Sequence, residues 1–427
     1  EVHSLIPGLV VTFESSPQLE AVARLKRRYA QVESLGPSLH VFTAEREPEA
    51  AVAGIRQALE NLPVEHIHTE EPELEDVVVA LLLKEREEQP AESAGSDHSC
   101  HPTGRQLLDG LAVEAKELIR DFGSFRAVDR VSFDMKQGEI FGLLGANGAG
   151  KTTVIKMLTG IVPPTAGEGR VAGADMRTAG GAIKERIGYM SQAFSLYLDL
   201  TVIENIRLFA GIYGLARREA QQRMEWIVEM AGLTGYEDDR TGRLPMGVRQ
   251  RLALGCALVH SPRVLFLDEP TSGVDPIGRR RFWELLSRLA REEGVAILIT
   301  THYLSEAEHC DRLALMYAGR IVAEGTPAHL KKQVERDIGQ LVEMVVDKPG
   351  IALAHVVAAG FAGAALFGTK IHVLSRDPGR DEGRLRDVLA RSGIAVGSVR
   401  TRMLSLEDVF VSRVMALEQA AQKEVSA

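Results

Sequence analysis

A glycine-rich loop near the middle of the chain carries the residue types that bind phosphate. Residues 145–152 read Gly-Ala-Asn-Gly-Ala-Gly-Lys-Thr, which fits the spacing GxxxxGK followed by Ser or Thr. Its glycines let backbone N–H groups approach phosphate oxygens, while Lys151 supplies a positive charge and the Thr152 hydroxyl can bind Mg²⁺. The apolar run 138–144 predicts a buried strand before the loop, and 153–158 predicts a helix after it. Strand, loop and helix in this order argue against a chance glycine loop.

A second apolar run ends in two acids. Residues 264–267 read Val-Leu-Phe-Leu, and Asp268 and Glu269 follow them. Four apolar residues in succession suit a parallel strand that is covered on both faces. Asp268 would hold Mg²⁺, directly or through water, and Glu269 would polarise an attacking water as general base. Alone, the pair would equally fit a strand end with solvated acids, but beside the phosphate loop it predicts a phosphate-loop NTPase.

Further residues make the chain resemble the ABC ATPases. Residues 271–276, Thr-Ser-Gly-Val-Asp-Pro, resemble the D-loop of that family. Gln192 is placed like the glutamine of its Q-loop, and His302 like its switch histidine. Phe122 is placed like the aromatic residue that stacks on adenine, with a plain core aromatic as the alternative. Together with the two motifs above, the resemblance covers about 111–330.

The resemblance implies which residues bind Mg·ATP and hydrolyse it. Gln192 would bind Mg²⁺ and sense a membrane partner, and His302 would donate to the γ-phosphate as charge develops in the transition state. The implied catalytic residues are Glu269, His302 and Gln192. The implied nucleotide-binding residues are Phe122, Gly145, Asn147, Gly148, Gly150, Lys151, Thr152 and Thr153. The implied metal-binding residues are Thr152, Gln192 and Asp268.

The signature loop departs from the family pattern. The family has Leu-Ser-Gly-Gly-Gln, whereas residues 244–248 read Leu-Pro-Met-Gly-Val. Pro245 removes the serine hydroxyl and a backbone N–H, and Met246 replaces a glycine that allows close approach to phosphate. Gly247 remains, and the helix expected at 250–259 can still turn its N-terminus toward a phosphate. Because two ABC domains of this family enclose two ATPs, the hypothesis is that this signature completes a slow site, while the site of the phosphate loop is catalytic.

The signature helix and the chain's end look most like the tandem ATP-binding subunits of type-two ABC exporters, through residues 252–260 and 406–410. This membership implies efflux of drugs, other small amphipathic compounds or cations through two polytopic membrane permease subunits, at the cytoplasmic face of the inner membrane. It also implies an upstream ABC domain, or a second copy, that completes the ATP sandwich. The alternatives are a soluble ABC ATPase acting on ribosomes or DNA, and a regulator that barely hydrolyses ATP. The net charge of -9 argues against a nucleic-acid partner.

The two ends of the chain repeat each other. Three pairs of segments keep one offset: 9–10 and 341–342, 39–42 and 371–374, 74–77 and 406–409. We therefore expect a duplicated small domain. In its first copy, short strands should alternate with helices: strands at 39–42 and 64–68, helices at 48–61 and 73–84. A capping box at 405–408 is expected to open the last helix.

The predicted fold class is α/β: a phosphate-loop NTPase core of ABC type with a helical subdomain around 200–258, flanked by two duplicated small α+β domains. The predicted domains are 1–84, the tail of a first unit whose ABC domain would lie upstream; 85–110, a flexible linker; 111–330, the ATPase; and 331–427, a second tail.

Other features are expected to be structural. No apolar run approaches the ~20 residues that span a bilayer. The three cysteines lack CxxC spacing, which indicates free thiols. His40 and His372 lie at equivalent places in strands and are expected to be packed or hydrogen-bonded rather than metal ligands. Residues 194–200 would receive a coupling helix of the membrane subunits, with ordinary subdomain packing as the alternative.

Overall fold

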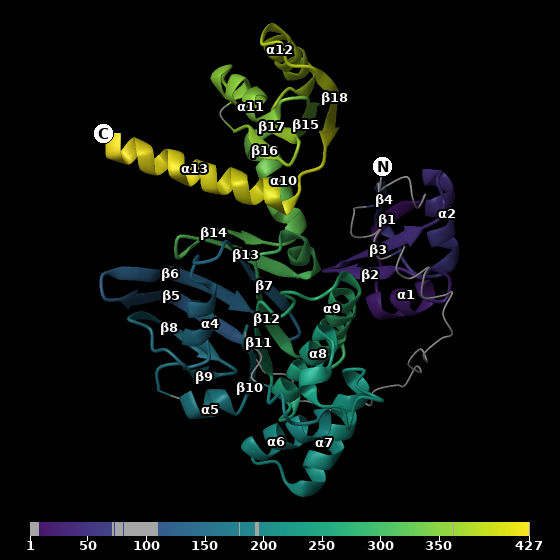
Figure 1. Ribbon diagram of the computed structural model, residues 1–427, viewed down its shortest axis with the longest axis vertical. Helices are drawn as coiled ribbons and strands as arrows, with labels where there is room; N and C mark the ends of the chain where they lie inside the picture. The colour runs from purple at the N-terminus through teal and green to yellow at the C-terminus, as the bar shows by residue number, and fades with distance from the viewer. Residues whose placement is uncertain are drawn as a thin grey trace.

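The computed structural model describes residues 8–70, 72, 80, 110–178, 180–192, 196–361 and 363–426. The linker predicted at 85–110 lies outside these ranges except for Gly110, and the helix predicted at 73–84 except for Ala80. Figure 1 shows a central body of sheets with a helical lobe, a small N-terminal domain beside it and a small C-terminal domain at the other end. The predicted α/β fold class is confirmed.

A six-stranded sheet forms the centre of the phosphate-loop domain, in the order β10-β11-β12-β7-β13-β14. Its strands are β7 (Ile140–Leu144), β10 (Ile187–Met190), β11 (Val264–Asp268), β12 (Ala296–Thr301), β13 (Arg312–Tyr317) and β14 (Arg320–Gly325). Strand β14 is antiparallel to β13, and the other neighbours are parallel. Strands β7, β11 and β12 are buried along their whole length, as parallel strands covered on both faces should be.

An antiparallel sheet, ordered β6-β5-β8-β9, shares one apolar core with the central sheet. It consists of β5 (Val113–Phe122), β6 (Phe125–Met135), β8 (Ala166–Val171) and β9 (Ala174–Asp175), and α5 (Gly180–Lys184) follows. Helix α4 (Lys151–Leu158) packs between the sheets, where Val154, Ile155 and Leu158 are fully buried. The helix that follows the phosphate loop is therefore fixed by apolar contacts on several sides.

The helical subdomain predicted around 200–258 is confirmed. It contains α6 (Val202–Ile212), α7 (Arg217–Met230), the 3-10 turn η2 (Thr241–Arg243) and α8 (Met246–Leu258). A capping box opens α6, because the Thr201 hydroxyl accepts the N–H of Glu204, whose carboxylate accepts the N–H of Thr201. Helix α8 begins at Met246, earlier than the expected 250. The reason is that Pro245, with φ −55°, suits the cap position before a first turn, where no N–H is needed.

Two further elements follow motifs of the nucleotide site. Helix α9 (Pro276–Arg291) follows the segment that resembles the D-loop, and the 3-10 helix η3 (Leu304–His309) follows His302 after one residue. Asp275 caps α9 by accepting the N–H of Gly278 at 2.9 Å. Helix α9 and η3 are therefore direct neighbours in the chain of two motifs singled out in the sequence.

The two small domains have one topology. The N-terminal domain contains β1 (Leu9–Glu14), α1 (Gln18–Leu25), β2 (Val32–Leu35), β3 (Ser38–Thr43), α2 (Pro48–Ala58) and β4 (Glu65–Glu70), with its sheet ordered β2-β3-β1-β4. The C-terminal domain contains β15 (Gln340–Val346), α11 (Pro349–Ala358), β16 (Ala365–Phe367), β17 (Lys370–Ser375), α12 (Pro378–Arg391) and β18 (Val396–Arg402), ordered β16-β17-β15-β18. Succession and strand order match between the copies, while the domain boundaries remain predictions.

The strand register corrects one detail of the predicted repeat. His40 pairs with Thr12 in the first copy, and His372 pairs with Glu343 in the second. Thr12 in the first copy is therefore equivalent to Glu343 in the second. The offset between these two residues is one residue shorter than the offset between His40 and His372.

The prediction that 9–10 matches 341–342 is consequently wrong. Burial sets the register, because a one-residue slip would turn core side chains to the other face of the sheet. The equivalent core residues are Val11 and Phe13 in one copy and Val342 and Met344 in the other.

Helices α10 (Pro327–Ile338) and α13 (Leu406–Ser426) join the C-terminal domain to the central sheet. The apolar cluster between these parts includes Leu144, Leu315, Leu330, Leu406 and Val409. The predicted capping box is confirmed: the Ser405 hydroxyl accepts the N–H of Asp408 at 3.2 Å, and the Asp408 carboxylate accepts the N–H of Ser405 at 2.9 Å. Within the described residues, no helix combines the length and apolar character that crossing a membrane requires.

Candidate active site: the phosphate loop and the acids of strand β11

The phosphate loop connects β7 to α4 through positions where only glycine fits. A Cβ on Gly145 would lie 2.3 Å from the carbonyl oxygen of Met316, and one on Gly150 would lie 2.5 Å from that of Ala127. Gly150 also has a φ of +104° and is the N-cap residue of α4. A Cβ on Gly148 would meet nothing within 4 Å, so the loop is packed on one side and open on the other. This is the form that a phosphate cradle requires.

Lys151 is held inside this loop. Its side chain is 5% exposed, and its ammonium donates to the carbonyl oxygens of Gly145 at 2.7 Å and Ala146 at 3.2 Å. The same nitrogen lies 3.5 Å from Oε1 of Glu269. Burial lowers the pKa of Lys151, and the nearby carboxylates of Glu269 and Asp268 oppose that change. A buried ammonium that now donates to two backbone carbonyls is well placed to donate to phosphate oxygens instead.

Asp268 is the centre of a set of oxygen atoms. The hydroxyl of Thr152 donates to Oδ1 of Asp268 at 3.1 Å, and the hydroxyl of Thr300 donates to the same atom at 2.7 Å. A carboxylate and a hydroxyl in contact are ligands that Mg²⁺ prefers. Thr300 was not predicted from the sequence. Thr300 lies beside Asp268 because the parallel strands β11 and β12 pair these two residues. In the sequence, the threonines at the end of the apolar run were the feature that could have indicated this position.

Three predicted site residues converge on Glu269. The amide of Gln192 donates to Oε2 of Glu269 at 3.1 Å, and Nδ1 of His302 lies 3.2 Å from the same oxygen. Lys151 approaches the other carboxylate oxygen. The Glu269 backbone has a φ of +49°, and its N–H donates to the carbonyl and hydroxyl oxygens of Thr300. This strained conformation, which costs about 1 kcal/mol, directs the carboxylate toward the phosphate loop.

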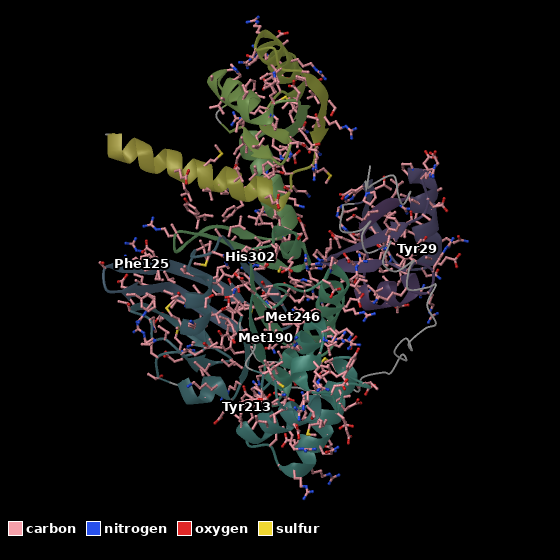
Figure 2. The ribbon with its side chains drawn as sticks, viewed as in Figure 1. Tyr29, Phe125, Met190, Tyr213, Met246 and His302 are labelled. Carbon is pink, nitrogen blue, oxygen red and sulfur yellow. The ribbon has the colours of Figure 1, made fainter. Side chains whose placement is uncertain are left out.

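The remaining predicted nucleotide-binding residues lie at the rim. Asn147 is exposed at the tip of the loop, and Thr153 is half-buried in the first turn of α4. The ring of Phe122 is 47% exposed at the end of β5, with the guanidinium of Arg120 at 4.5 Å from its centroid. Phe122 is therefore not a core aromatic. In Figure 2, His302 lies near the centre of the molecule, whereas Phe125 lies at the outer edge of the antiparallel sheet.

The signature segment is tied to the strand that carries the acids. Met246 is 42% exposed at the first turn of α8, and Pro245 offers no side-chain cap. The buried side chain of Gln250 donates to the carbonyl oxygen of Pro270, directly after Glu269. Sequence reasoning missed Gln250, since a single polar residue in a helix gives no sign of a distant backbone partner.

These residues fit a magnesium-bound nucleoside triphosphate. The glycine cradle has no room for Cβ atoms where its backbone turns, and the ammonium of Lys151 points into it. Thr152 and Asp268 present oxygens for Mg²⁺, with Gln192 close by on Glu269. Six predicted site residues from separate parts of the sequence thus lie together at one end of the central sheet: Lys151, Thr152, Gln192, Asp268, Glu269 and His302.

Comparison with known proteins agrees with this geometry. Residues 128–272 match the family described as ABC transporter. The chain is 44% identical over 295 residues to the probable multidrug ABC transporter ATP-binding protein YbhF of Escherichia coli, an alignment that covers 68% of this chain and 49% of YbhF. The chain thus spans about half the length of the YbhF proteins that it matches.

A second relative is matched almost completely. The Nod factor export ATP-binding protein I of Burkholderia thailandensis is 37% identical over 300 residues, which cover 70% of this chain and 95% of that protein. Among solved structures, cbiO1 of Clostridium perfringens, part of an ABC transporter complex, is 27% identical, with 53% of this chain and 95% of that one covered and a TM-score of 0.49. The nearly complete match to the Nod factor protein, together with the family match, shows that the chain belongs to the ATP-binding proteins of ABC transporters.

Proposed function

We propose that this chain is the ATP-hydrolysing motor subunit of an ABC exporter, with its transmembrane pathway on other chains. The observation that carries the proposal is the convergence of Lys151, Gln192 and His302 on the carboxylate of Glu269. A general base must lie within reach of the phosphate site and of the groups that orient it, and Glu269 meets both conditions.

The proposed mechanism assigns a task to each side chain. Lys151 exchanges its backbone carbonyl partners for phosphate oxygens, and Glu269 then turns to orient the attacking water and accept its proton. His302 stays beside Glu269 and donates to the transferring phosphoryl group. Mg²⁺, when bound at Thr152 and Asp268, supplies charge neutralisation between phosphate oxygens. Phe122 offers an exposed ring on which adenine can stack.

The exporter part of the proposal rests on the relatives. The names of YbhF and the Nod factor protein describe multidrug transport and export, which supports drug-like or other small compounds as the proposed cargo. The resemblance to type-two exporters adds cations to the proposed cargo. The exposed Tyr197 and Leu198 beside the helical subdomain offer an apolar contact for a coupling helix of two polytopic permease subunits. The subunit would then work at the cytoplasmic face of the inner membrane, as a peripheral component.

The proposed organisation is a tandem one. The N-terminal small domain would be the tail of a preceding ABC unit, and that unit, or a second copy, would complete the ATP sandwich. The altered signature at 244–248 would make the two sites unequal. Replacing Pro245→Ser and Met246→Gly together in the intact protein should raise turnover. Unchanged turnover would contradict the asymmetry.

The hydrolysis proposal is tested by Glu269→Gln in the full-length protein. We expect nucleotide binding to persist and steady-state ATP hydrolysis to fall at least ~100-fold, because the general base is removed. Glu292→Gln, which alters an exposed acid near the end of α9, is the matched control and should retain full turnover. Hydrolysis that survives in Glu269→Gln would overturn the assignment.

The partner proposal is tested by purifying the tagged full-length protein from detergent-solubilised membranes. Stoichiometric polytopic membrane proteins in the eluate would support the exporter. Recovery only in the soluble fraction, with ribosomes or DNA, would instead favour the soluble ABC alternative.

A further inference from the structure

The N-terminal small domain docks on the cassette through the edge strand β2. Glu33 on this strand forms an ion pair with Arg280 on α9, and the two side chains are only 20% and 14% exposed. A second ion pair joins Lys26, after α1, to Glu284 on α9 at 3.1 Å, but both of its side chains are at least 40% exposed. In Figure 1 the N-terminal domain lies directly beside α9. The Glu33–Arg280 pair is therefore the shielded ionic contact of this interface.

The same strand reaches η3. Nδ1 of His309 donates to the carbonyl oxygen of Ser34 at 2.9 Å, and the His309 ring stacks on Trp283 of α9 at 4.6 Å. Burial lowers the pKa of His309 to about 4, so its ring is neutral near pH 7 beside two arginines. A Cβ on Gly36 would lie 2.9 Å from the carbonyl oxygen of Cys310, so the turn after β2 touches the backbone at the end of η3. Strand β2 therefore contacts both α9 and η3.

From there, contacts lead to the proposed general base. Arg279, next to Arg280 on α9, lies with its guanidinium 5.4 Å from the ring centroid of Tyr303. The Tyr303 ring packs against His302 at 4.1 Å, and His302 lies 3.2 Å from Glu269. A displacement of α9 relative to η3 would therefore change the position of the His302 ring.

We infer that the N-terminal small domain positions the switch histidine of this cassette, with Glu33 and Arg280 as positioning residues. The domain fixes the position of α9 relative to η3. Arg279 and Tyr303 then hold the His302 ring beside Glu269. This inference rests on the proposed function. In a tandem organisation it means that the tail of one unit controls the hydrolytic readiness of the next unit.

A positioning function and simple packing predict different changes in kcat and KM. The residues proposed to bind nucleotide, Lys151, Thr152 and Phe122, lie on α4 and β5, which are elements other than β2, α9 and η3. Loss of the docking contact should therefore reduce kcat and leave KM for ATP nearly constant. Coupling through packed side chains typically amounts to about twofold to thirtyfold.

The test is a charge swap in the full-length protein. In Glu33→Arg, which sets two cations against each other, we expect kcat for ATP hydrolysis to fall about fivefold with KM for ATP within about twofold. In Glu33→Arg combined with Arg280→Glu, kcat should return to within about twofold of wild type because the pair is restored with opposite signs. Lys26→Ala, which breaks the exposed pair of the same interface, is the control and should change kcat less than twofold.

Two further measurements keep the inference separate from the proposed function and from folding. Glu33→Gln removes the charge without repulsion and should give a smaller fall both in kcat and in the thermal midpoint than Glu33→Arg, since Arg280 keeps the nearby charge of Glu284. The His302 ring signals in histidine-selective NMR spectra should shift in Glu33→Arg and return in the swap, since the Tyr303 ring current acts on them. Unaltered His302 signals, unaltered kcat, or a swap that folds but does not recover would each overturn the inference. A wild-type protein that does not hydrolyse ATP would contradict the proposed function alone, and the NMR result would then decide the inference.

Discussion

The two small domains share one strand order but meet the cassette in different ways. The N-terminal domain touches α9 and η3 with polar groups of one edge strand, Glu33 and Ser34. The C-terminal domain is joined by two helices, α10 and α13, through an apolar cluster that includes Ala307 of η3. Both domains therefore reach η3, one through a small set of polar contacts and one through a continuous apolar core. The same fold thus serves as a docking module in one place and as a fixed extension in the other.

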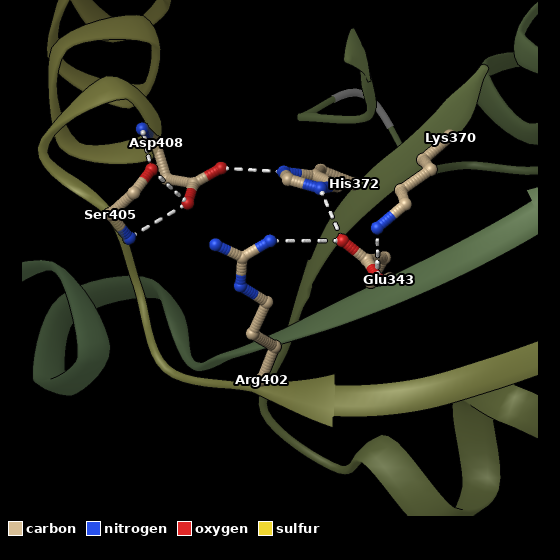
Figure 3. Close-up of polar contacts among 6 residues, drawn as sticks. All are labelled: Glu343, Lys370, His372, Arg402, Ser405 and Asp408. Atoms are coloured by element: carbon tan, nitrogen blue, oxygen red, sulfur yellow. Dashed lines mark hydrogen bonds and ion pairs between the residues drawn. The ribbon is translucent and has the colours of Figure 1, made fainter. Parts of the chain in front are cut away.

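The equivalent histidines show the same difference. In the C-terminal domain, Nδ1 of His372 contacts Asp408 at 2.7 Å and Nε2 contacts Glu343 at 3.2 Å (Figure 3). Lys370 and Arg402 also bind Glu343, at 2.9 and 3.2 Å. His372 is thus hydrogen-bonded, as the sequence predicted, and it ties the start of α13 to the sheet.

The N-terminal counterpart has no such cluster within the described residues. His40 faces Thr12, where the C-terminal copy has Glu343, and burial lowers the pKa of His40 to about 4. The buried hydroxyl of Thr12 has no hydrogen-bond partner in the part of the chain that the structure describes. Within the described residues, the strand position opposite the histidine therefore holds an ion-paired glutamate in one copy and a threonine in the other.

The largest expected effect comes from breaking the ionic anchor. Glu343→Gln leaves Lys370 and Arg402 without their shared countercharge and should destabilise the protein by roughly 2 kcal/mol, less than a fully buried pair because Lys370 and Arg402 are partly exposed. The matched change is Thr12→Val at the equivalent place, which removes an unpaired hydroxyl and should be neutral or stabilising. Thermal unfolding of both variants measures the difference, and an equal loss in both would contradict the comparison.

The two small domains should respond to acid at different pH values. His309 and His40 have pKa values lowered to about 4 from 6.5, so the unfolded or undocked chain takes up protons first and the docking contact weakens as pH falls from 6.5 toward 4. Burial opposes ionisation of Glu343 and Asp408, but their hydrogen bonds hold both pKa values below the ordinary 4.5 and 3.8. The ionised carboxylates of Glu343 and Asp408 therefore stabilise the folded chain above pH values of 4.5 and 3.8, and this stabilisation is lost only at lower pH. We therefore expect the N-terminal domain to undock before the C-terminal anchor fails.

Fluorescence can follow the undocking, because Trp283 stacks on His309. The chain has two tryptophans, so Trp226→Phe leaves Trp283 as the reporter. Its emission should change between pH 6.5 and 4. The groups facing His309 are the Ser34 carbonyl, His40, Arg279 and Arg280, and His309→Gln should make the transition shallower. A transition that keeps its slope in His309→Gln would show that other groups control the docking.

A smaller effect is expected from the turns at the end of the edge strands. Gly36 and Gly368 occupy equivalent turns with φ values of +55° and +58°. Alanine at either place should cost about 1 kcal/mol for the backbone conformation. A Cβ on Gly36 would also meet the Cys310 carbonyl at 2.9 Å, whereas one on Gly368 would meet nothing within 4 Å. Gly36→Ala should therefore be the more destabilising by denaturant unfolding. Equal losses would mean that the N-terminal domain does not press on η3.

The smallest effect is expected from Lys26→Ala. The Lys26–Glu284 pair is exposed on both sides, so its removal should cost less than about 0.5 kcal/mol and should depend on salt concentration. Chemical denaturation at low and high salt measures this. A loss as large as that of Gly36→Ala would show that the rim, rather than β2, carries the docking energy.

Local sequence patterns predicted the nucleotide site but not its long-range connections. Lys151, Asp268 and Glu269 stand in motifs whose residue types follow directly from phosphate and magnesium chemistry, and the structure brings them together. Thr300 was missed because its place depends on how two parallel strands are aligned. Glu33 and Arg280 were missed because each looks like an ordinary surface charge until the domains are docked.

The repeat shows the same limit. Similar residues at a constant spacing identified the two copies and the position of His372. The one-residue shift in the first strand, however, depends on which side chains fill the core. The start of α8 at Met246 likewise depends on Pro245 acting as a helix boundary, which the family pattern of the signature did not contain.

Hydrogen–deuterium exchange of the segment 304–309 in the full-length protein tests the central claim most directly. The account predicts that Glu33→Arg raises amide exchange in η3, while exchange in the cores of both small domains stays at its wild-type rate and Lys26→Ala has no effect on η3. The charge swap of Glu33 and Arg280 should return η3 to the wild-type rate. Exchange in η3 that is the same in wild type and Glu33→Arg would contradict the claim that the N-terminal domain holds the switch segment.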